Sequence, residues 1–160
     1  MIQSKERLKQ LLSITQKESL HLKAVSQRLK KILPKTEDEL REKLNEPQLI
    51  DTLESFTAKF SRMQDTIADK LLPIFLSTAG ENIGTVIENL NRAEKLSLIS
   101  DTQQWLVARG LRNKLVHEYI EDLQELLDAV ELAQQFVNEL IHSFEAIQSY
   151  SLKQLRIQQV

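Results

Sequence analysis

Apolar residues recur at helical spacing along almost the whole chain. From about Ile2 to Leu33 one returns every three or four positions, with Lys, Gln and Glu between them, and Pro34 ends the pattern. This narrow stripe lies close to a heptad seam, so it predicts a helix that packs either on the body of the domain or on a partner helix. The stripe consists of Leu8, Leu11, Thr15, Leu22, Val25, Leu29 and Ile32.

A short helix and then a long one are predicted next. Thr36 is a good N-cap, with Glu39 as its capping-box partner, and this helix is expected to end before Pro47. In the long helix Pro73 is expected to introduce a kink or an end, and Gly80 to stop any continuation. The apolar stripe of the long helix consists of Leu49, Leu53, Phe56, Phe60, Met63, Ile67 and Leu71.

Three more helices complete the pattern. One is predicted over residues 83–98, and another begins after the capping pair Ser100-Asp101. The last spans residues 123–147, with Glu121-Asp122 as its predicted cap. The tail over residues 149–160 is expected to fray. In these three helices, taken in order, the positions predicted to face inward are Val86, Leu90, Ala93 and Leu96, then Trp105, Ala108, Leu111 and Leu115, then Leu126, Val130, Ala133, Val137, Leu140 and Phe144.

Composition agrees with a helical fold. The 160 residues include only three Gly and three Pro, fewer than the turns of a sheet protein require, and no convincing strand or repeat. We therefore predict one all-α domain over residues 1–160, an antiparallel bundle of four to five main helices. It divides into an N-terminal helical extension over residues 1–45 and a core over residues 46–148. The sequence shows no signal peptide and no membrane-spanning run, so the cytoplasm is the default location.

Cysteine content and charge exclude several functions. Without Cys there is no disulfide, no Cys-ligated zinc and no Cys nucleophile. A net charge of −2 and a pI near 6.0 do not suit a protein that coats nucleic acid electrostatically. A nucleic-acid role would need a local basic site, which two subunits could share.

The segment from Arg109 to Tyr119 concentrates the candidate chemistry. Arg109, Asn113 and His117 follow one another at one-turn intervals on a single helix face. Arg112 lies on a neighbouring face, and its long side chain can bend toward the same pocket. Gly110 in a helix interior costs about 1 kcal/mol relative to Ala, a cost that close approach of a backbone or ligand would justify.

These residue types suit cleavage of RNA. His exchanges protons near neutral pH, and Arg presents a planar fork of donors to phosphate. Attack of a ribose 2′-OH on the adjacent phosphate would use His117 for the proton and Arg112 for the charge on the phosphoryl oxygens. No cofactor and no metal are expected, since no two His stand at ligand spacing.

Simpler structural roles remain open for each residue. Arg112 could pair with Glu118 or Glu121, and Tyr119 could serve packing. Arg62 and Asp65 are read as an exposed polar face, with a supporting contact from Asp65 to Arg112 as the alternative. His21 and His142, outside the segment, are read as structural or surface residues.

The combined pattern resembles the HEPN family, and within it the HepT-type toxins. Their signature is Arg, four residues, His, one residue, Tyr, which Arg112, His117 and Tyr119 satisfy, with Asn113 as the polar residue usual after the Arg. The stretch Phe56–Asp65 is similar to the family's first core helix. Asn91–Leu96 followed by Trp105 is similar to the approach to its motif helix. The resemblance covers about residues 49–147.

The resemblance implies a symmetric dimer, or a higher homo-oligomer, that pairs through the motif helices. It implies a type VII-like toxin–antitoxin system in which a metal-independent endoribonuclease cleaves mRNA or tRNA, with Arg112 and His117 catalytic and Arg109 and Asn113 supporting. An MNT-type nucleotidyltransferase antitoxin would neutralise it by transferring AMP to Tyr119. Two alternatives stay open: a non-catalytic HEPN subunit that holds substrate for a nucleotidyltransferase, and a helical adaptor that uses its N-terminal seam.

Overall fold

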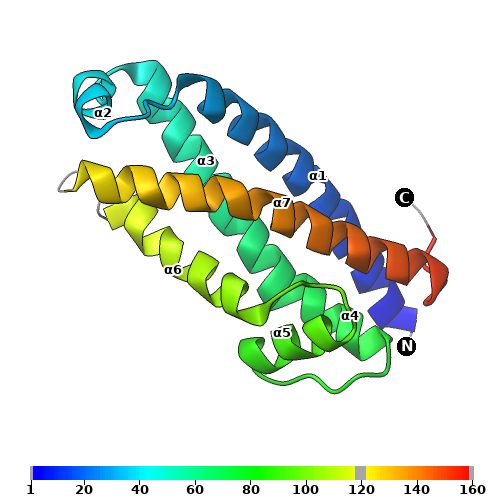
Figure 1. Ribbon diagram of the computed structural model, residues 1–160. Helices are drawn as coiled ribbons and strands as arrows, with labels where there is room; N and C mark the ends of the chain where they lie inside the picture. The colour runs from blue at the N-terminus through cyan, green and yellow to red at the C-terminus, as the bar shows by residue number, and fades with distance from the viewer. Residues whose placement is uncertain (1, 118–121, 159–160) are drawn as a thin grey trace.

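The computed structural model describes residues 2–117 and 122–158, with side chains for residues 3–115 and 122–158 (Figure 1). Within these residues all regular structure is helical and there is no strand, as predicted. None of these helices is both long enough and apolar enough to cross a membrane. The elements are α1 (Ile2–Ile32), α2 (Glu37–Lys43), α3 (Pro47–Asp65), the π-helical turn η1 (Thr66–Leu71), α4 (Leu72–Thr78), α5 (Val86–Lys95), α6 (Thr102–His117) and α7 (Leu123–Lys153).

The four long helices α1, α3, α6 and α7 run in alternating directions (Figure 1). α3 and α7 pack against each other, and both α1 and α6 pack against this pair. An aromatic chain runs through the centre: Phe60 meets Phe136 edge to face at 6.4 Å between ring centroids, and Phe136 meets Trp105 at 5.4 Å. These contacts fix α3, α7 and α6 relative to one another beneath the candidate segment.

The N-terminal helix shares the main hydrophobic core. Its predicted seam is buried, with Leu8, Leu22, Val25 and Leu29 fully inaccessible to solvent. The seam packs against α3, α7 and α4, so α1 adopts the first of the two predicted arrangements, on the body of the domain. The expected extension over residues 1–45 is therefore not set apart from the rest of the core.

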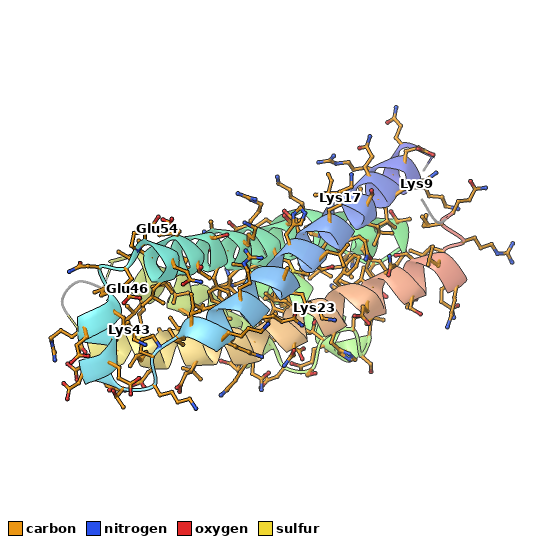
Figure 2. All side chains as sticks on the ribbon, turned by 90° about the horizontal axis from the view of Figure 1, so that it is seen from above. Lys9, Lys17, Lys23, Lys43, Glu46 and Glu54 are labelled. Atoms are coloured by element: carbon orange, nitrogen blue, oxygen red, sulfur yellow. The ribbon has the colours of Figure 1, made fainter. Side chains whose placement is uncertain are left out.

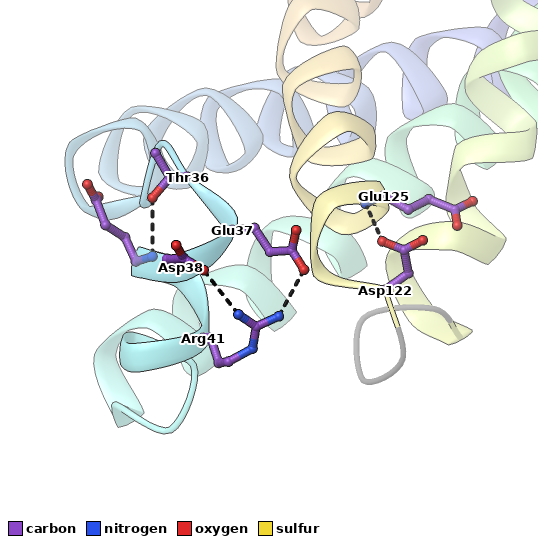
Figure 3. A network of polar contacts seen from close by, with 7 residues as sticks. Thr36, Glu37, Asp38, Arg41, Asp122 and Glu125 are labelled. Carbon is purple, nitrogen blue, oxygen red and sulfur yellow. Dashed lines mark hydrogen bonds and ion pairs between the residues drawn. The ribbon is translucent and has the colours of Figure 1, made fainter.

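Side-chain caps start the helices where polar residues predicted them. Thr36 accepts a hydrogen bond from the backbone N–H of Glu39 at 3.2 Å, and Asp122 accepts one from Glu125 at 3.0 Å (Figure 3). α2 lies beside the start of α7, so these two capped ends are neighbours in space. On the exposed side of α2, Arg41 forms ion pairs with Glu37 and Asp38.

Pro73 does not end its helix. The chain passes from α3 through η1 into α4, and the N–H of Leu72 reaches back five residues to the carbonyl of Ile67. A proline ring in a regular helix collides with the carbonyl four residues earlier, here that of Asp69, and the widened turn precedes Pro73. The stop comes at Gly80, as predicted. Gly80 adopts φ +81°, and the N–H of Glu81 bonds Leu76 in a Schellman motif.

Two predicted boundaries are wrong. The helix expected from residue 83 begins at Val86, because Thr85 accepts the N–H of Glu88 and acts as the cap, and Ile83 is exposed. The last helix continues to Lys153 instead of fraying after residue 148. Ser151 is fully buried there, and its hydroxyl donates to the carbonyl of Ile147 at 2.7 Å.

Candidate functional site

The candidate residues are carried by α6, whose N-terminus is fixed by two carboxylates. Asp101 accepts the backbone N–H of Gln103 at 2.9 Å, and Glu94 on α5 accepts that of Thr102 at 2.7 Å. Asp101 thus supplies the predicted cap, while Ser100 instead donates to Glu139 on α7. The core side of α6 presents Trp105, Ala108, Leu111 and Leu115, all buried. Arg109, Arg112 and Asn113 lie on sides of α6 that do not face the core.

Arg112 is held by Asp65, the last residue of α3. Its Nη1 donates to Asp65 Oδ1 at 2.6 Å, and about a third of each side chain is exposed. The supporting contact weighed as an alternative is therefore the one observed, while Glu118 and Glu121 lie outside the described residues. A guanidinium carries five N–H donors, so this single contact orients Arg112 and leaves most of its fork for another acceptor.

Arg109 forms a second, looser pair one turn earlier on α6. Its Nη1 lies 3.6 Å from Asp69 Oδ1, beyond hydrogen-bonding distance, and this nitrogen is buried with no hydrogen-bond partner among the described residues. Asp65 immediately precedes η1, and Asp69 lies in the middle of it. Two cations on α6 thus face two anions on the neighbouring helix, and the pairing 65 with 112 and 69 with 109 shows that the two helices are antiparallel here.

A cleft of about 940 Å³ opens between α3 and α6 beside these arginines. Its volume falls in the range of ligand-binding clefts. One wall carries Arg109, Arg112 and the exposed Asn113. The facing wall belongs to α3, with Ile50, Leu53 and Glu54 toward its beginning and the small residues Thr57, Ala58 and Ser61 beyond them. The full lining is Leu44, Ile50, Leu53, Glu54, Thr57, Ala58, Ser61, Arg109, Arg112, Asn113 and Leu115.

Sequence reasoning missed the α3 wall of the cleft. Thr57, Ala58 and Ser61 recur at one-turn spacing beside the apolar stripe. A row of small residues flanking a core stripe was the available signal, because small side chains leave space between neighbouring helices. These small residues indicate a cleft only when it is known that α6 is the helix that packs against this side of α3.

The structure brings together three of the five predicted site residues. His117 is the last residue of α6, so its backbone lies one turn beyond Asn113 on the same face. The cleft extends in this direction, toward the beginning of α3. The side chain of His117 and the whole of Tyr119 lie outside the described residues. His21 and His142 are exposed on α1 and α7, in agreement with the predicted surface role.

Gly110 has no close neighbour in the described part of the chain. A Cβ built there would meet no atom within 4 Å, so the close backbone approach expected at Gly110 does not come from residues 2–117 or 122–158. Beside it a groove of about 600 Å³ lies between α6 and α7, and Val107 and Leu132 are 60% and 48% exposed there. The outer side of the candidate helix is thus partly apolar and open.

Two further findings bear on the site. Within residues 2–117 and 122–158, no group of three or more His, Cys, Asp or Glu could hold a metal ion. No protein-family model, characterised protein sequence or solved structure matches the chain.

Proposed function

We propose that this protein is a metal-independent endoribonuclease, the toxin of a HEPN-type toxin–antitoxin pair. The observation that carries the proposal is Arg112. It is anchored by Asp65, it opens on the cleft, no other described residue accepts from its guanidinium, and Arg109 and Asn113 line the same wall. An oriented guanidinium in a partly enclosed cleft stabilises charge that develops on phosphoryl oxygens.

The reaction is an internal transesterification of RNA. The ribose 2′-oxygen forms a bond to phosphorus and the bond from phosphorus to the 5′-oxygen breaks, which leaves a 2′,3′-cyclic phosphate and a 5′-hydroxyl. His117 takes the proton from the 2′-OH or supplies one to the leaving 5′-oxygen. Arg112 and Arg109 bind the phosphate, and Asn113 supports its position.

Two copies assemble through α6 in this proposal. The pair of four-helix bundles would place two sets of Arg112 and His117 at one composite cleft, and it would raise the local positive charge that a chain of net charge −2 lacks. The open surface around Gly110 and Val107 supports this face as the contact. An MNT-type nucleotidyltransferase in the same cytoplasm would act as antitoxin by transferring AMP to Tyr119.

The test is cleavage of total tRNA and mRNA by the purified chain in excess EDTA. We expect 2′,3′-cyclic ends and a loss on the order of 10²–10⁴ in rate for His117→Ala and for Arg112→Ala. Arg112→Lys keeps the charge but loses the planar fork, so it should also be impaired.

Matched controls use equivalent residues elsewhere. His21→Ala removes an exposed histidine of α1 that lines neither the cleft nor the groove between α6 and α7, and Arg92→Ala removes an arginine that pairs with Glu81 at 3.4 Å. Both should cleave at the wild-type rate. Cleavage that requires added metal, or that survives His117→Ala, would remove the assigned roles. A wild-type chain that binds a nucleotidyltransferase but cleaves nothing would point to the non-catalytic subunit instead.

A further inference from the structure

The charge of this protein is strongly segregated along the chain. The first 35 residues hold nine of the 21 Lys and Arg but only two of the 23 Asp and Glu, a net charge of +7. The other 125 residues hold 12 basic and 21 acidic residues, a net charge of −9. The overall value of −2 therefore conceals one basic helix, α1, on an otherwise acidic molecule.

Eight of these nine cations lie on α1, and the ninth, Lys35, follows it. All of them are exposed except Lys9, which is half-buried; Lys9, Lys17 and Lys23 lie along the helix in Figure 2. Among the described residues none of the nine has a carboxylate within 4 Å, whereas the observed ion pairs involve Arg41, Arg92, Arg109, Arg112 and Lys114. The positive charge of α1 is thus not neutralised within the chain.

Three of these cations share one face of α1. At 100° per residue, Lys17, Arg28 and Lys31 fall within about 60° of one another on the side of α1 away from the core seam. Lys23 and Lys30 lie about 80–160° round the helix from these three, toward α7, where they line a small groove together with Glu145. From Lys5 to Lys31 the surface extends for about 40 Å at 1.5 Å per residue. We call this surface the α1 ridge.

The chemistry of the α1 ridge favours a polyanion over a protein partner. Residues 1–35 contain no aromatic residue, and Ile14 and Leu20 are the large apolar side chains exposed on α1. Stable protein interfaces depend on a buried centre of aromatic or aliphatic anchors, which the ridge lacks. Phosphate backbones are bound by Lys and Arg spread along a surface, with no need for such a centre.

We propose that the α1 ridge binds the phosphate backbone of the RNA at a distance from the cleavage site. This rests on the proposed ribonuclease function and specifies its substrate. α1 and α6 each pack against α3 and α7, on opposite sides of that pair (Figure 1). With helices about 10 Å across, the ridge lies on the order of 20–30 Å from the cleft. The substrate is therefore an RNA long enough to reach both, and a tetranucleotide reaches only the cleft.

The experiment compares two triple variants that remove the same charge. Lys17→Gln/Arg28→Gln/Lys31→Gln alters the ridge, and Lys95→Gln/Lys153→Gln/Arg156→Gln alters exposed cations of α5 and of the C-terminal end. Gln preserves helix propensity, and circular dichroism checks the fold. Binding of a fluorescent folded tRNA transcript is measured by anisotropy between 50 and 200 mM KCl in the His117→Ala background, so that no cleavage intervenes.

We expect the ridge variant to bind tRNA on the order of 10-fold or more weakly at 50 mM KCl. The slope of log affinity against log salt should fall by about 0.7–0.9 for each lost contact, about 2–3 in total. The control variant should match the parent. With His117 intact, the ridge variant should cleave a tetranucleotide normally and raise KM for tRNA.

Other outcomes would overturn the inference. They are equal tRNA binding by the two triple variants, or a ridge variant that loses only the complex with an antitoxin or with anionic phospholipid vesicles. Failure of the proposed function looks different: tRNA would bind through the ridge and remain uncleaved.

Discussion

Arg112 and Asp65 are joined by an ion pair of 2.6 Å that ties the end of α3 to the second half of α6. The two residues are 47 positions apart in the sequence, and the contact requires the packing of α3 on α6. The guanidinium is thereby oriented before any ligand arrives. Such pre-orientation is what a group that stabilises a transition state needs.

Removing the charge of Asp65 should impair cleavage more than folding. Asp65→Asn keeps the size of the side chain but loses the charge-assisted bond, so we expect cleavage to fall on the order of 10–100-fold. The free energy of unfolding should change by about 1 kcal/mol or less, because the pair is partly exposed. Single-turnover cleavage and urea unfolding measure the two effects. Asp38→Asn, which loosens the exposed pair with Arg41, is the control and should cleave normally. Full activity of Asp65→Asn would show that Arg112 needs no anchor.

The apolar groove between α6 and α7 should govern assembly. Val107→Asp or Leu132→Asp would place a charge in the proposed interface. We therefore expect the parent to be a dimer at micromolar concentration and each variant to be a monomer. Light scattering gives the mass. Ile83→Asp and Ile87→Asp change equally exposed isoleucines at α5 and should remain dimeric. A parent protein that is monomeric and fully active on RNA would exclude the shared cleft.

Control by AMP transfer should depend on Tyr119. The chain has two tyrosines, and Tyr150 packs edge to face on Phe75 at 5.3 Å between centroids. After co-expression with a nucleotidyltransferase of the proposed antitoxin class, intact mass spectrometry should find an AMP adduct on the parent and on Tyr150→Phe, but not on Tyr119→Phe. The adduct would compete with an RNA phosphate for Arg112. A Tyr119→Phe toxin that the partner still neutralises fully would show that binding alone suffices.

Glu18 should make the stability of the protein depend on pH. Burial raises the pKa of this carboxyl above its usual range, against the opposing effects of the Thr66 hydroxyl, which donates to it at 3.1 Å, and of nearby Arg62 and Lys70. The folded state therefore binds more protons than the unfolded chain between the two pKa values. Stability contributed by neutral Glu18 is complete below the unfolded pKa and is lost as pH rises through the folded pKa.

Glu18→Gln tests this dependence. The variant keeps an acceptor for Thr66 and cannot ionise, so its stability relative to the parent should increase from about pH 4 upward and then level off. Urea unfolding between pH 3.5 and 8 measures the difference. Glu42→Gln, on the exposed side of α2, reports the effect of losing one surface carboxylate. A difference between Glu18→Gln and the parent that does not change with pH would contradict the assignment to burial.

Local signals in the sequence predicted most of the helices. The seam of α1 and the caps at Thr36 and Asp122 depend on residues within a few positions of one another, so sequence spacing was enough to find them. The turn η1 and the continuation of α7 to Lys153 were missed. The first departs from the regular period, and the second depends on burial of Ser151 and Ile157 by the rest of the molecule.

In the candidate site, too, local sequence predicted one part and helix packing decides the other. Arg109, Arg112 and Asn113 were predicted as neighbours because they occupy adjacent turns of one helix. The contact from Asp65 was one of two readings, and the α3 wall of the cleft was not predicted at all. Both depend on the axial offset at which α3 packs against α6, and no short stretch of sequence encodes that offset.

The π-helical turn η1 has a consequence for the length of its segment. The π-helical bond in η1 takes up one extra residue, so the face that the segment buries stays the same on both sides of the turn. Phe56 and Phe60 before η1 and Phe75 after it therefore all point into the core. In a regular helix of the same length, Phe75 would be turned by about 100° away from the face that Phe56 and Phe60 bury. Deleting one residue of 66–71 would restore a regular helix and keep Phe75 on that face, so the extra residue and the wide turn depend on each other.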